Sequence, residues 1–291
     1  MQPAQDQQYS LKHADDNITE TRSGKKTIEV SESTFLSPDY DENCSTRGLA
    51  VLVQNFDPEC PHIEKLNSQC NELMELLQSY EYGLEIFGNR IHENLTKDDL
   101  YTLCSSVAKD IDNNENNYYY CLLFVILGHG SSGIIRCKTD TGNTDYAELS
   151  KIMEFFQPQN CAALALKPKV FIVQTMEPKD PNQADALGMH DDVKERKQQR
   201  IPRESDFLTY TSDEPCYLSD NKFLNSIVKT LDDEQKTWYQ KSRSVNPIPV
   251  TEIQSLLIKI NRNLKETNSK VPYTTSSLTR KMYLQKRTFQ V

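Results

Sequence analysis

The sequence lacks any apolar run long enough to cross a membrane, and Met1 to Ser10, rich in Gln, lack the apolar core of a secretory signal peptide. It also lacks a basic excess: the formal net charge at pH 7 is −9, and the isoelectric point is about 5.2. An acidic chain is a poor partner for nucleic acid or for an anionic membrane surface. We therefore expect a cytoplasmic protein with neither nucleic acid nor membrane among its partners.

Cysteines are present, but not at the spacing of a zinc site. The chain has eight Cys, and no two of them form a Cys-X-X-Cys pair, so a zinc ribbon is not expected. With the reducing cytosol as the expected compartment, free thiols are predicted in place of disulfides. We expect no cofactor and no metal.

Apolar residues are scarce, at 37% of the chain, and the mean hydropathy is −0.66. This polar composition indicates loop-rich or unstructured parts. Residues 1–43 show no sustained period, and we predict that they form a mostly disordered leader. Residues 179–203 combine Pro, Gln and Asn with mixed charge, which predicts an exposed linker.

The rest of the chain alternates strand-like and helix-like segments. Apolar runs predict buried strands at residues 49–53, 121–127 and 170–174. Residues 82–87, which end at Gly88-Asn89, suit a further strand, and a last strand is predicted at Tyr273–Leu284. Apolar residues at helical spacing predict helices at 63–79, 96–111, 147–156, 223–231 and 251–264. Thr96 followed by Asp99 offers a capping box for the second helix. This alternation predicts an α/β fold, a mostly parallel sheet flanked by helices.

Two short motifs follow two of the predicted strands. One strand runs into Gly128-His129-Gly130, and a later strand runs into Gln174-Thr175-Met176-Glu177-Pro178. In an open α/β sheet, the carboxyl ends of the strands are where a site is built. A His at one strand end and a short motif at another, about 50 residues on, is the arrangement of one class of Cys/His protease.

From about Arg47 to Leu284 the sequence resembles the caspase family. The matching segments are Arg47 to Ala50, Gly128 to Ile135, Lys167 to Gln174, Ile201-Pro202, Ser205 to Leu208, Ile260 to Arg262, Val271-Pro272 and Leu278 to Leu284. The resemblance implies a caspase-like three-layer α/β/α domain. It divides the chain into a large-subunit-like region (44–178), the linker (179–203) and a small-subunit-like region (204–291).

The pentapeptide at the expected nucleophile departs from the caspase pattern. Met176 stands where the family has its Cys, and Glu177 and Pro178 stand where it has Arg and Gly. Attack on a peptide carbonyl needs a thiolate, which a neighbouring His promotes, whereas a thioether has no proton to lose. The resemblance thus implies that His129 keeps the position of the base, while Met176 replaces the nucleophile and is inactive.

The pocket for the substrate Asp departs as well. The family presents two Arg and one Gln to that carboxylate, and Gln174 matches the Gln. Ile63 falls near one Arg position, and the other falls in the shortened loop Asp220-Asn221-Lys222. We predict that Ile63, Gln174 and Asn221 mark an eroded substrate pocket.

Plainer explanations stand beside these. His129 can be an inherited loop residue with a structural role. Met176 can be a ligand for a soft metal, and the plainer explanation is that it is an apolar side chain that fills a collapsed cleft. In the linker, Asp185 is followed by a small residue, which suits processing by an active caspase, and a merely flexible loop fits equally well. The basic run Lys194–Arg200 is typical of a solvated segment.

Three functions remain open. The first is a non-catalytic caspase homologue that regulates active caspases or apoptosis-type signalling by dimerisation or competition. It would pair with a caspase-family protein, as a homodimer or heterodimer, through the closing strand Tyr273–Leu284, which is polar for an obligate interface. The second is an active cysteine endopeptidase of the family with an unrecognised nucleophile. The third is a scaffold for which the fold is only a platform.

Overall fold

The structure, a computed structural model, describes residues 37–40, 46–56, 60, 63–113, 119–131, 133–139, 145–177, 206–215 and 221–287. A compact unit begins at Pro38. Asp185 and the rest of the predicted linker lie outside the described residues, so linker processing stays a prediction.

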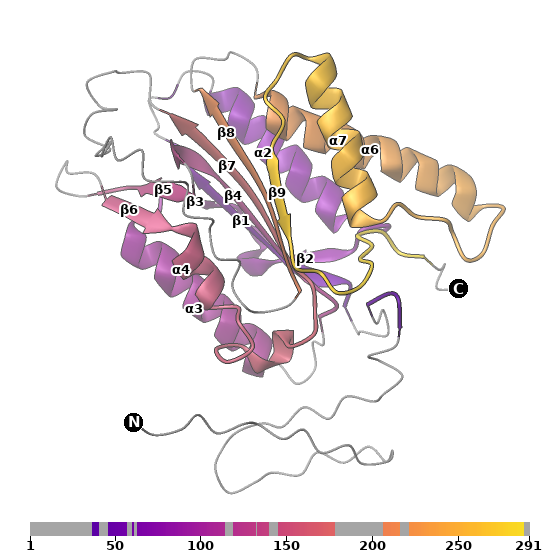
Figure 1. Cartoon of the computed structure of the whole chain (residues 1–291), viewed down its shortest axis with the longest axis horizontal. Coiled ribbons are helices and arrows are strands. Elements are labelled where there is room, and N and C mark those ends of the chain that lie inside the picture. The colour runs from indigo at the N-terminus through magenta and orange to yellow at the C-terminus, as the bar shows by residue number, and fades with distance from the viewer. Residues whose placement is uncertain are drawn as a thin grey trace, which may run out of the picture. The chain divides into compact units, whose positions relative to one another are not determined.

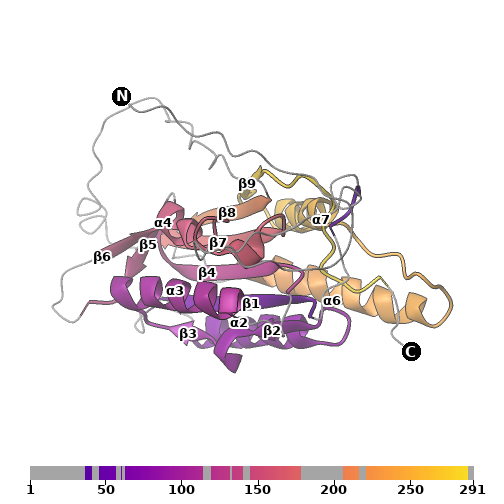
Figure 2. The ribbon, with the colours of Figure 1, turned by 90° about the horizontal axis from the view of Figure 1, so that it is seen from below.

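A mostly parallel sheet forms the middle layer of this unit (Figure 1). Its strands follow the order β2 (Leu84–Ile86), β1 (Gly48–Asn55), β4 (Leu122–Ser131), β7 (Lys169–Glu177), β8 (Phe207–Pro215) and β9 (Tyr273–Ser276), as Figure 2 shows. Along this path every neighbouring pair is parallel except β8 and β9. The short β3 (His92–Glu93) pairs with β1, and β5 (Ile134–Cys137) and β6 (Asp145–Glu148) extend from the end of β4.

Helices cover both faces of the sheet (Figure 1). One face carries α2 (Ile63–Gln78), α6 (Lys222–Ser242) and α7 (Ile253–Glu266), and the other carries α3 (Lys97–Asn113) and α4 (Leu149–Glu154). Two 3-10 turns, η1 (Phe87–Asn89) and η2 (Ala162–Leu164), complete the described helical elements. The α/β fold with a mostly parallel central sheet is confirmed.

The central strand β4 explains why its sequence is a continuous apolar run. Leu123, Val125 and Leu127 pack into the core beneath α2, α6 and α7. Phe124 and Ile126 pack into the second core, beneath α3 and α4. Because successive side chains of a strand point to opposite faces, a strand covered on both sides needs apolar residues at every position.

The predicted helices are present, with shifted ends. The capping box at α3 is confirmed, because Thr96 Oγ1 accepts a hydrogen bond from the Asp99 amide at 3.1 Å and the Thr96 amide donates to Asp99 Oδ2 at 3.4 Å. The helix predicted at 147–156 is shorter, since residues 145–148 pair as strand β6. Helix α6 is longer than its predicted apolar segment, with the buried Trp238 anchoring its second half.

The folded unit also includes residues within the predicted leader 1–43. The Tyr40 amide donates to the Lys281 carbonyl at 3.1 Å, and the Tyr40 side chain is buried. Its hydroxyl donates to the buried Asp206 carboxylate at 2.6 Å, where Thr279 Oγ1 also donates at 2.7 Å. The segment Pro38–Tyr40 thus packs against the C-terminal part of the chain, which a composition-based boundary could not show.

The closing strand is shorter than the predicted Tyr273–Leu284. Strand β9 ends at Ser276, while Met282 and Leu284 are buried in the core. The Met282 carbonyl accepts a hydrogen bond from the Ile253 amide at 2.9 Å, so this part of the chain is held against the start of α7. Only Tyr273–Ser276 therefore offers an exposed strand to a partner.

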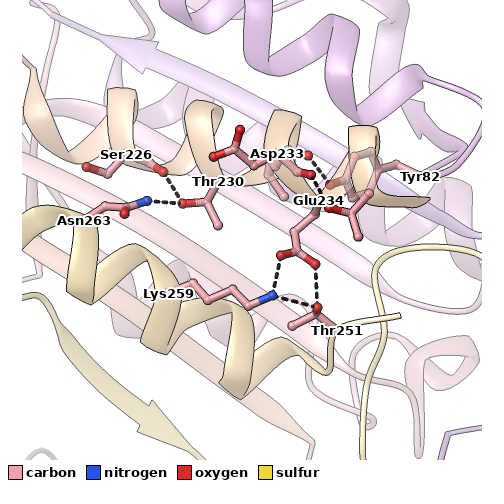
Figure 3. Close-up of polar contacts among 10 residues, drawn as sticks. Tyr82, Ser226, Thr230, Asp233, Glu234, Thr251, Lys259 and Asn263 are labelled. Atoms are coloured by element: carbon pink, nitrogen blue, oxygen red, sulfur yellow. Dashed lines mark hydrogen bonds and ion pairs between the residues drawn. The ribbon is translucent and has the colours of Figure 1, made fainter. Parts of the chain in front are cut away.

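A polar network joins α6 to α7 (Figure 3). Asn263 Nδ2 donates to Thr230 Oγ1 at 3.0 Å. The Glu234 carboxylate accepts from both Lys259 and Thr251, and Lys259 Nζ also donates to Thr251 Oγ1 at 3.1 Å. These contacts define which flank of α7 faces α6, and the opposite flank is turned toward β8.

Replacing Tyr40 with Phe should lower the free energy of unfolding, because a buried carboxylate loses one of its donors. We expect a loss of about 1–3 kcal/mol in urea denaturation. The matched control is Tyr273→Phe, at an exposed Tyr, which should stay within about 0.5 kcal/mol of wild type. Equal stability of the two variants would show that Pro38–Tyr40 does not belong to the folded unit.

Candidate functional site

The two motifs meet at the carboxyl edge of the sheet. Strands β4 and β7 are parallel neighbours, and their register places His129 opposite Met176. The Nδ1 atom of His129 lies 3.4 Å from the carbonyl oxygen of Met176. The structure therefore brings together the predicted base position and the predicted nucleophile position.

Glycine is required on each side of His129, and the steric reason differs between the two positions. A Cβ at Gly128 would approach the Asn55 carbonyl oxygen to 2.8 Å, so the close packing of β1 requires Gly there. Gly130 has a φ of +148°, and a Cβ there would meet the carbonyl oxygen of Ile134 at 1.9 Å. Gly128 is thus needed for the packing of β4 against β1, and Gly130 for the pairing of β4 with β5, whether or not His129 takes part in chemistry.

The imidazole of His129 is packed inside the protein. Only 5% of His129 is exposed, and the Phe56 ring packs against it edge-on at a centroid distance of 5.7 Å. The Met176 carbonyl next to it is a hydrogen-bond acceptor. These contacts hold the ring in place as a structural residue would be held.

Met176 is a core residue. It is 5% exposed and belongs to the same apolar cluster as Phe56 and Leu127. A thioether is a flexible apolar side chain that fills irregular gaps, and it can neither ionise nor form an acyl-enzyme. What Met176 offers at this position is packing.

Gln174 and Asn221 form a reciprocal amide pair. Gln174 Nε2 donates to Asn221 Oδ1 at 2.8 Å, and Asn221 Nδ2 donates to Gln174 Oε1 at 2.9 Å. Gln174 is fully buried and Asn221 is 5% exposed. The two predicted pocket residues are brought together, but each amide is engaged by the other.

Asn221 has a second task at the start of α6. Its Oδ1 also accepts a hydrogen bond from the Leu224 amide at 3.0 Å, which makes Asn221 the N-cap of the helix. Ile63, the third predicted pocket residue, is the first residue of α2 and packs against the apolar core. It supplies apolar contact and no cation. Residues 216–220, the rest of the shortened loop, lie outside the described residues.

A contact that sequence reasoning missed adds a negative charge beside β7. The Thr175 hydroxyl donates to the Asp213 carboxylate, and the two residues are register partners on β7 and β8. Thr175, the partner of this carboxylate, lies between Gln174 and Met176 in the sequence. The contact depends on which strand lies beside β7 and in which register, and neither is encoded by a local motif.

The described cysteines offer no reactive thiol. Cys60, Cys70, Cys104, Cys121, Cys137 and Cys161 are all buried. Burial raises the pKa of the Cys137 thiol to about 11 and the pKa values of Cys70 and Cys161 to about 12. Because the thiolate is the nucleophile, such thiols are poorly reactive at neutral pH. Cys44 and Cys216 lie outside the described residues.

The described part of the chain contains neither a metal site nor a membrane-spanning helix. No group of three or more His, Cys, Asp or Glu side chains is placed to hold a metal ion there. None of the helices described there has the length and apolar character needed to pass through a membrane.

Comparison with known proteins identifies the family. The family model described as "Caspase domain" matches residues 47–283, and the chain therefore belongs to the caspase family. Similar proteins include Caspase-3 of Mus musculus, 26% identical over 277 residues that cover 89% of this chain and 92% of the mouse protein. Caspase-3 of Bos taurus is 28% identical over 224 residues, covering 69% of this chain and 74% of the bovine protein.

A solved structure supports the same fold. The crystal structure of Caspase-1 from Spodoptera frugiperda aligns with a TM-score of 0.60, covering 88% of this chain and 96% of that chain. The two sequences are 20% identical, so this likeness concerns the fold. It agrees with the expected caspase-like architecture.

Replacing Asn221 with Ala should lower the free energy of unfolding. It removes the N-cap of α6, worth about 0.5–2 kcal/mol, and leaves the buried Gln174 amide unpaired, at about 1–3 kcal/mol. We expect a combined loss of about 2–4 kcal/mol in urea denaturation.

The matched control is Asn225→Ala, an exposed Asn one turn further along α6, which should change stability by no more than about 0.5 kcal/mol. In a double-mutant cycle, Gln174→Ala should cost less when Asn221 is already Ala. Purely additive effects would contradict the amide pair.

Proposed function

We propose that this protein is a non-catalytic member of the caspase family that regulates active caspases, or apoptosis-type signalling, by protein–protein interaction. The observation that carries the proposal is Met176, a buried thioether at the place in the sheet where the family resemblance puts the nucleophile. His129 without a thiol opposite it cannot support acyl transfer.

The substrate side of the site supports the same proposal. A caspase-type pocket presents Arg and Gln donors to a substrate carboxylate. Here Gln174 is engaged by Asn221, Ile63 is apolar, and the Asp213 carboxylate accepts from Thr175. A second carboxylate would meet negative charge and few available donors among these residues.

The proposed mode of action is pairing through the exposed edge of the sheet. Caspase-family members commonly dimerise, and in the family resemblance the closing strand is the pairing element. In this chain β9 is the last strand of the described sheet and all four of its residues are exposed. A partner in the cytoplasm, where we place this protein, would be an active caspase protomer, with activation or inhibition as the possible results.

Mixing the purified protein with active caspases tests the proposal. We expect co-elution in size-exclusion chromatography with at least one family member, and a change in its rate of peptide cleavage. Tyr273→Ala should weaken that association by roughly tenfold, because exposed Tyr residues are frequent binding hot spots. Tyr239→Ala is the matched control, since Tyr239 is similarly exposed on α6, at 44% against 53% for Tyr273. Neither co-elution nor a rate change with any family member would overturn the proposal.

An active protease with an unrecognised nucleophile is the second candidate, and one sequence feature favours testing it. Cys216 directly follows Pro215, the last residue of β8, whose carboxyl end lies at the same edge as His129. This candidate requires wild type to cleave Asp-containing peptides and to react with a thiol-directed affinity probe. Both activities should then be lost in Cys216→Ser.

Restoring the thiol separates the two candidates. We expect Met176→Cys to give at most slight turnover of Asp-containing peptides, because the pocket amide of Gln174 stays engaged. Wild type should give none, and the described cysteines should resist alkylation at pH 8 until the protein is unfolded in urea, because all six are buried and the pKa values of Cys70, Cys137 and Cys161 are raised. Turnover by wild type, abolished in Cys216→Ser, would instead establish the protease.

A further inference from the structure

Among the described residues, strand β9 has no strand paired on its outer side. Its pairs run from Leu208–Ser276 to Thr211–Tyr273 along β8, and it stands at the end of the strand order in the described sheet. All four of its residues are exposed. An edge strand presents backbone N–H and C=O groups to which a strand of another chain can pair.

The segments on both sides of β9 are basic in an acidic chain. Residues 262–272 carry Arg262, Lys265 and Lys270 against the single acid Glu266. Residues 277–287 carry Arg280, Lys281, Lys286 and Arg287 and contain no acidic residue. The carboxylates that contact this region include Asp213, which accepts from Thr175, Asp39, which pairs with Arg287, and Asp206, which accepts from Tyr40 and Thr279. Lys286 lies against Tyr80 and Glu81, next to β2 at the other end of the sheet, so Lys270, Arg280 and Lys281 are the cations nearest to β9 in the sequence. The segments next to β9 are therefore locally basic, although the whole chain has a net charge of −9.

Apolar side chains lie on both faces of this edge. On the α7 side, Asn261 accepts a hydrogen bond from Tyr210 of β8 at 2.7 Å, so this flank of α7 faces the sheet. Ile258, three residues earlier on the same flank, is 58% exposed. Tyr273 pairs with Thr211 and so points to the face opposite Tyr210, where it is 53% exposed.

A second copy of this chain fits the edge poorly. Antiparallel pairing of β9 with another β9 brings the residues before the strand in one copy beside the residues after it in the other. Lys270, whose Nζ lies 5.5 Å from the centroid of the Tyr273 ring, would then approach Arg280 of the second copy. Like charges placed opposite one another destabilise strand pairing, and two-fold symmetry makes the contact occur twice.

We propose that the β9 edge accepts an extended segment of a different protein with acidic residues at both ends of the pairing strand, and that its basic flanks select against self-pairing. This inference deepens the proposed function, on which its biological role rests, by giving the chemistry of the partner. The strand backbone supplies pairing, Ile258 and Tyr273 supply apolar contacts, and the flanking cations select the acidic partner.

A charge reversal at Lys270 tests the selection against self-pairing. Lys270→Glu places an acid beside Arg280 of a second copy, so the dimer should become roughly tenfold tighter in sedimentation equilibrium at low salt. The gain should disappear at high salt, where exposed charges are screened. Lys229→Glu, an equal charge change at an exposed position of α6, should leave the dimer constant unchanged. Thermal unfolding should confirm that both variants are folded.

Synthetic peptides test the acidic partner directly. Two fluorescent peptides share a Thr-Val-Thr-Val core and carry two Glu or two Lys at each end. We expect the Glu-flanked peptide to bind wild type roughly tenfold tighter than the Lys-flanked one at low salt, and Lys270→Glu to reduce that preference. Equal binding of the two peptides, or a tight wild-type homodimer that salt does not affect, would overturn the inference.

The peptide experiment needs no caspase, so the proposed function and the proposed chemistry of the β9 edge can be overturned independently of one another. A Glu-flanked preference together with no caspase association overturns the proposed function and supports the edge chemistry. Caspase association without any Glu-flanked preference supports the proposed function and overturns the edge chemistry.

Discussion

The parallel pairing of β4 with β7 is the constraint on which the rest of the structure depends. It runs from Leu122–Lys169 to His129–Met176 and buries both strands on both faces. Because both strands are buried, they need apolar residues at successive positions. The register of the pair determines which side chains lie next to one another at the carboxyl edge of the sheet. Shifting this register by one residue would reverse the side chains of β7, so the pairing of His129 with Met176 follows from the packing of the whole sheet.

The same packing determines what surrounds the residues of the candidate site. A buried thioether and an imidazole held by Phe56 form part of an apolar core, and the amides of Gln174 and Asn221 satisfy each other. Buried polar groups need partners, and once those partners are internal they are no longer available to a ligand. The residues at this carboxyl edge therefore contribute to stability.

The interaction that we propose lies at a different edge of the described sheet, along β9. Strand β9 is exposed, carries the exposed Tyr273 and has basic flanks, while α7 beside it is joined to α6 by the Thr230, Glu234 and Lys259 network (Figure 3). A braced helix next to an open strand gives a partner a fixed surface, which lowers the ordering cost of association. Stability at one edge and recognition at another are what a non-catalytic family member would need.

The sequence by itself determined the fold class, the order of the main elements, the α3 capping box and the meeting of His129 with Met176, because apolar periodicity and strand-end motifs are local signals. Only the tertiary structure decided that Gln174 and Asn221 bind each other, that Thr175 contacts Asp213, that Tyr40 joins the core and that the closing strand ends at Ser276. Each of these depends on residues far apart in the chain whose distance and register are fixed by packing, and no local pattern carries that information.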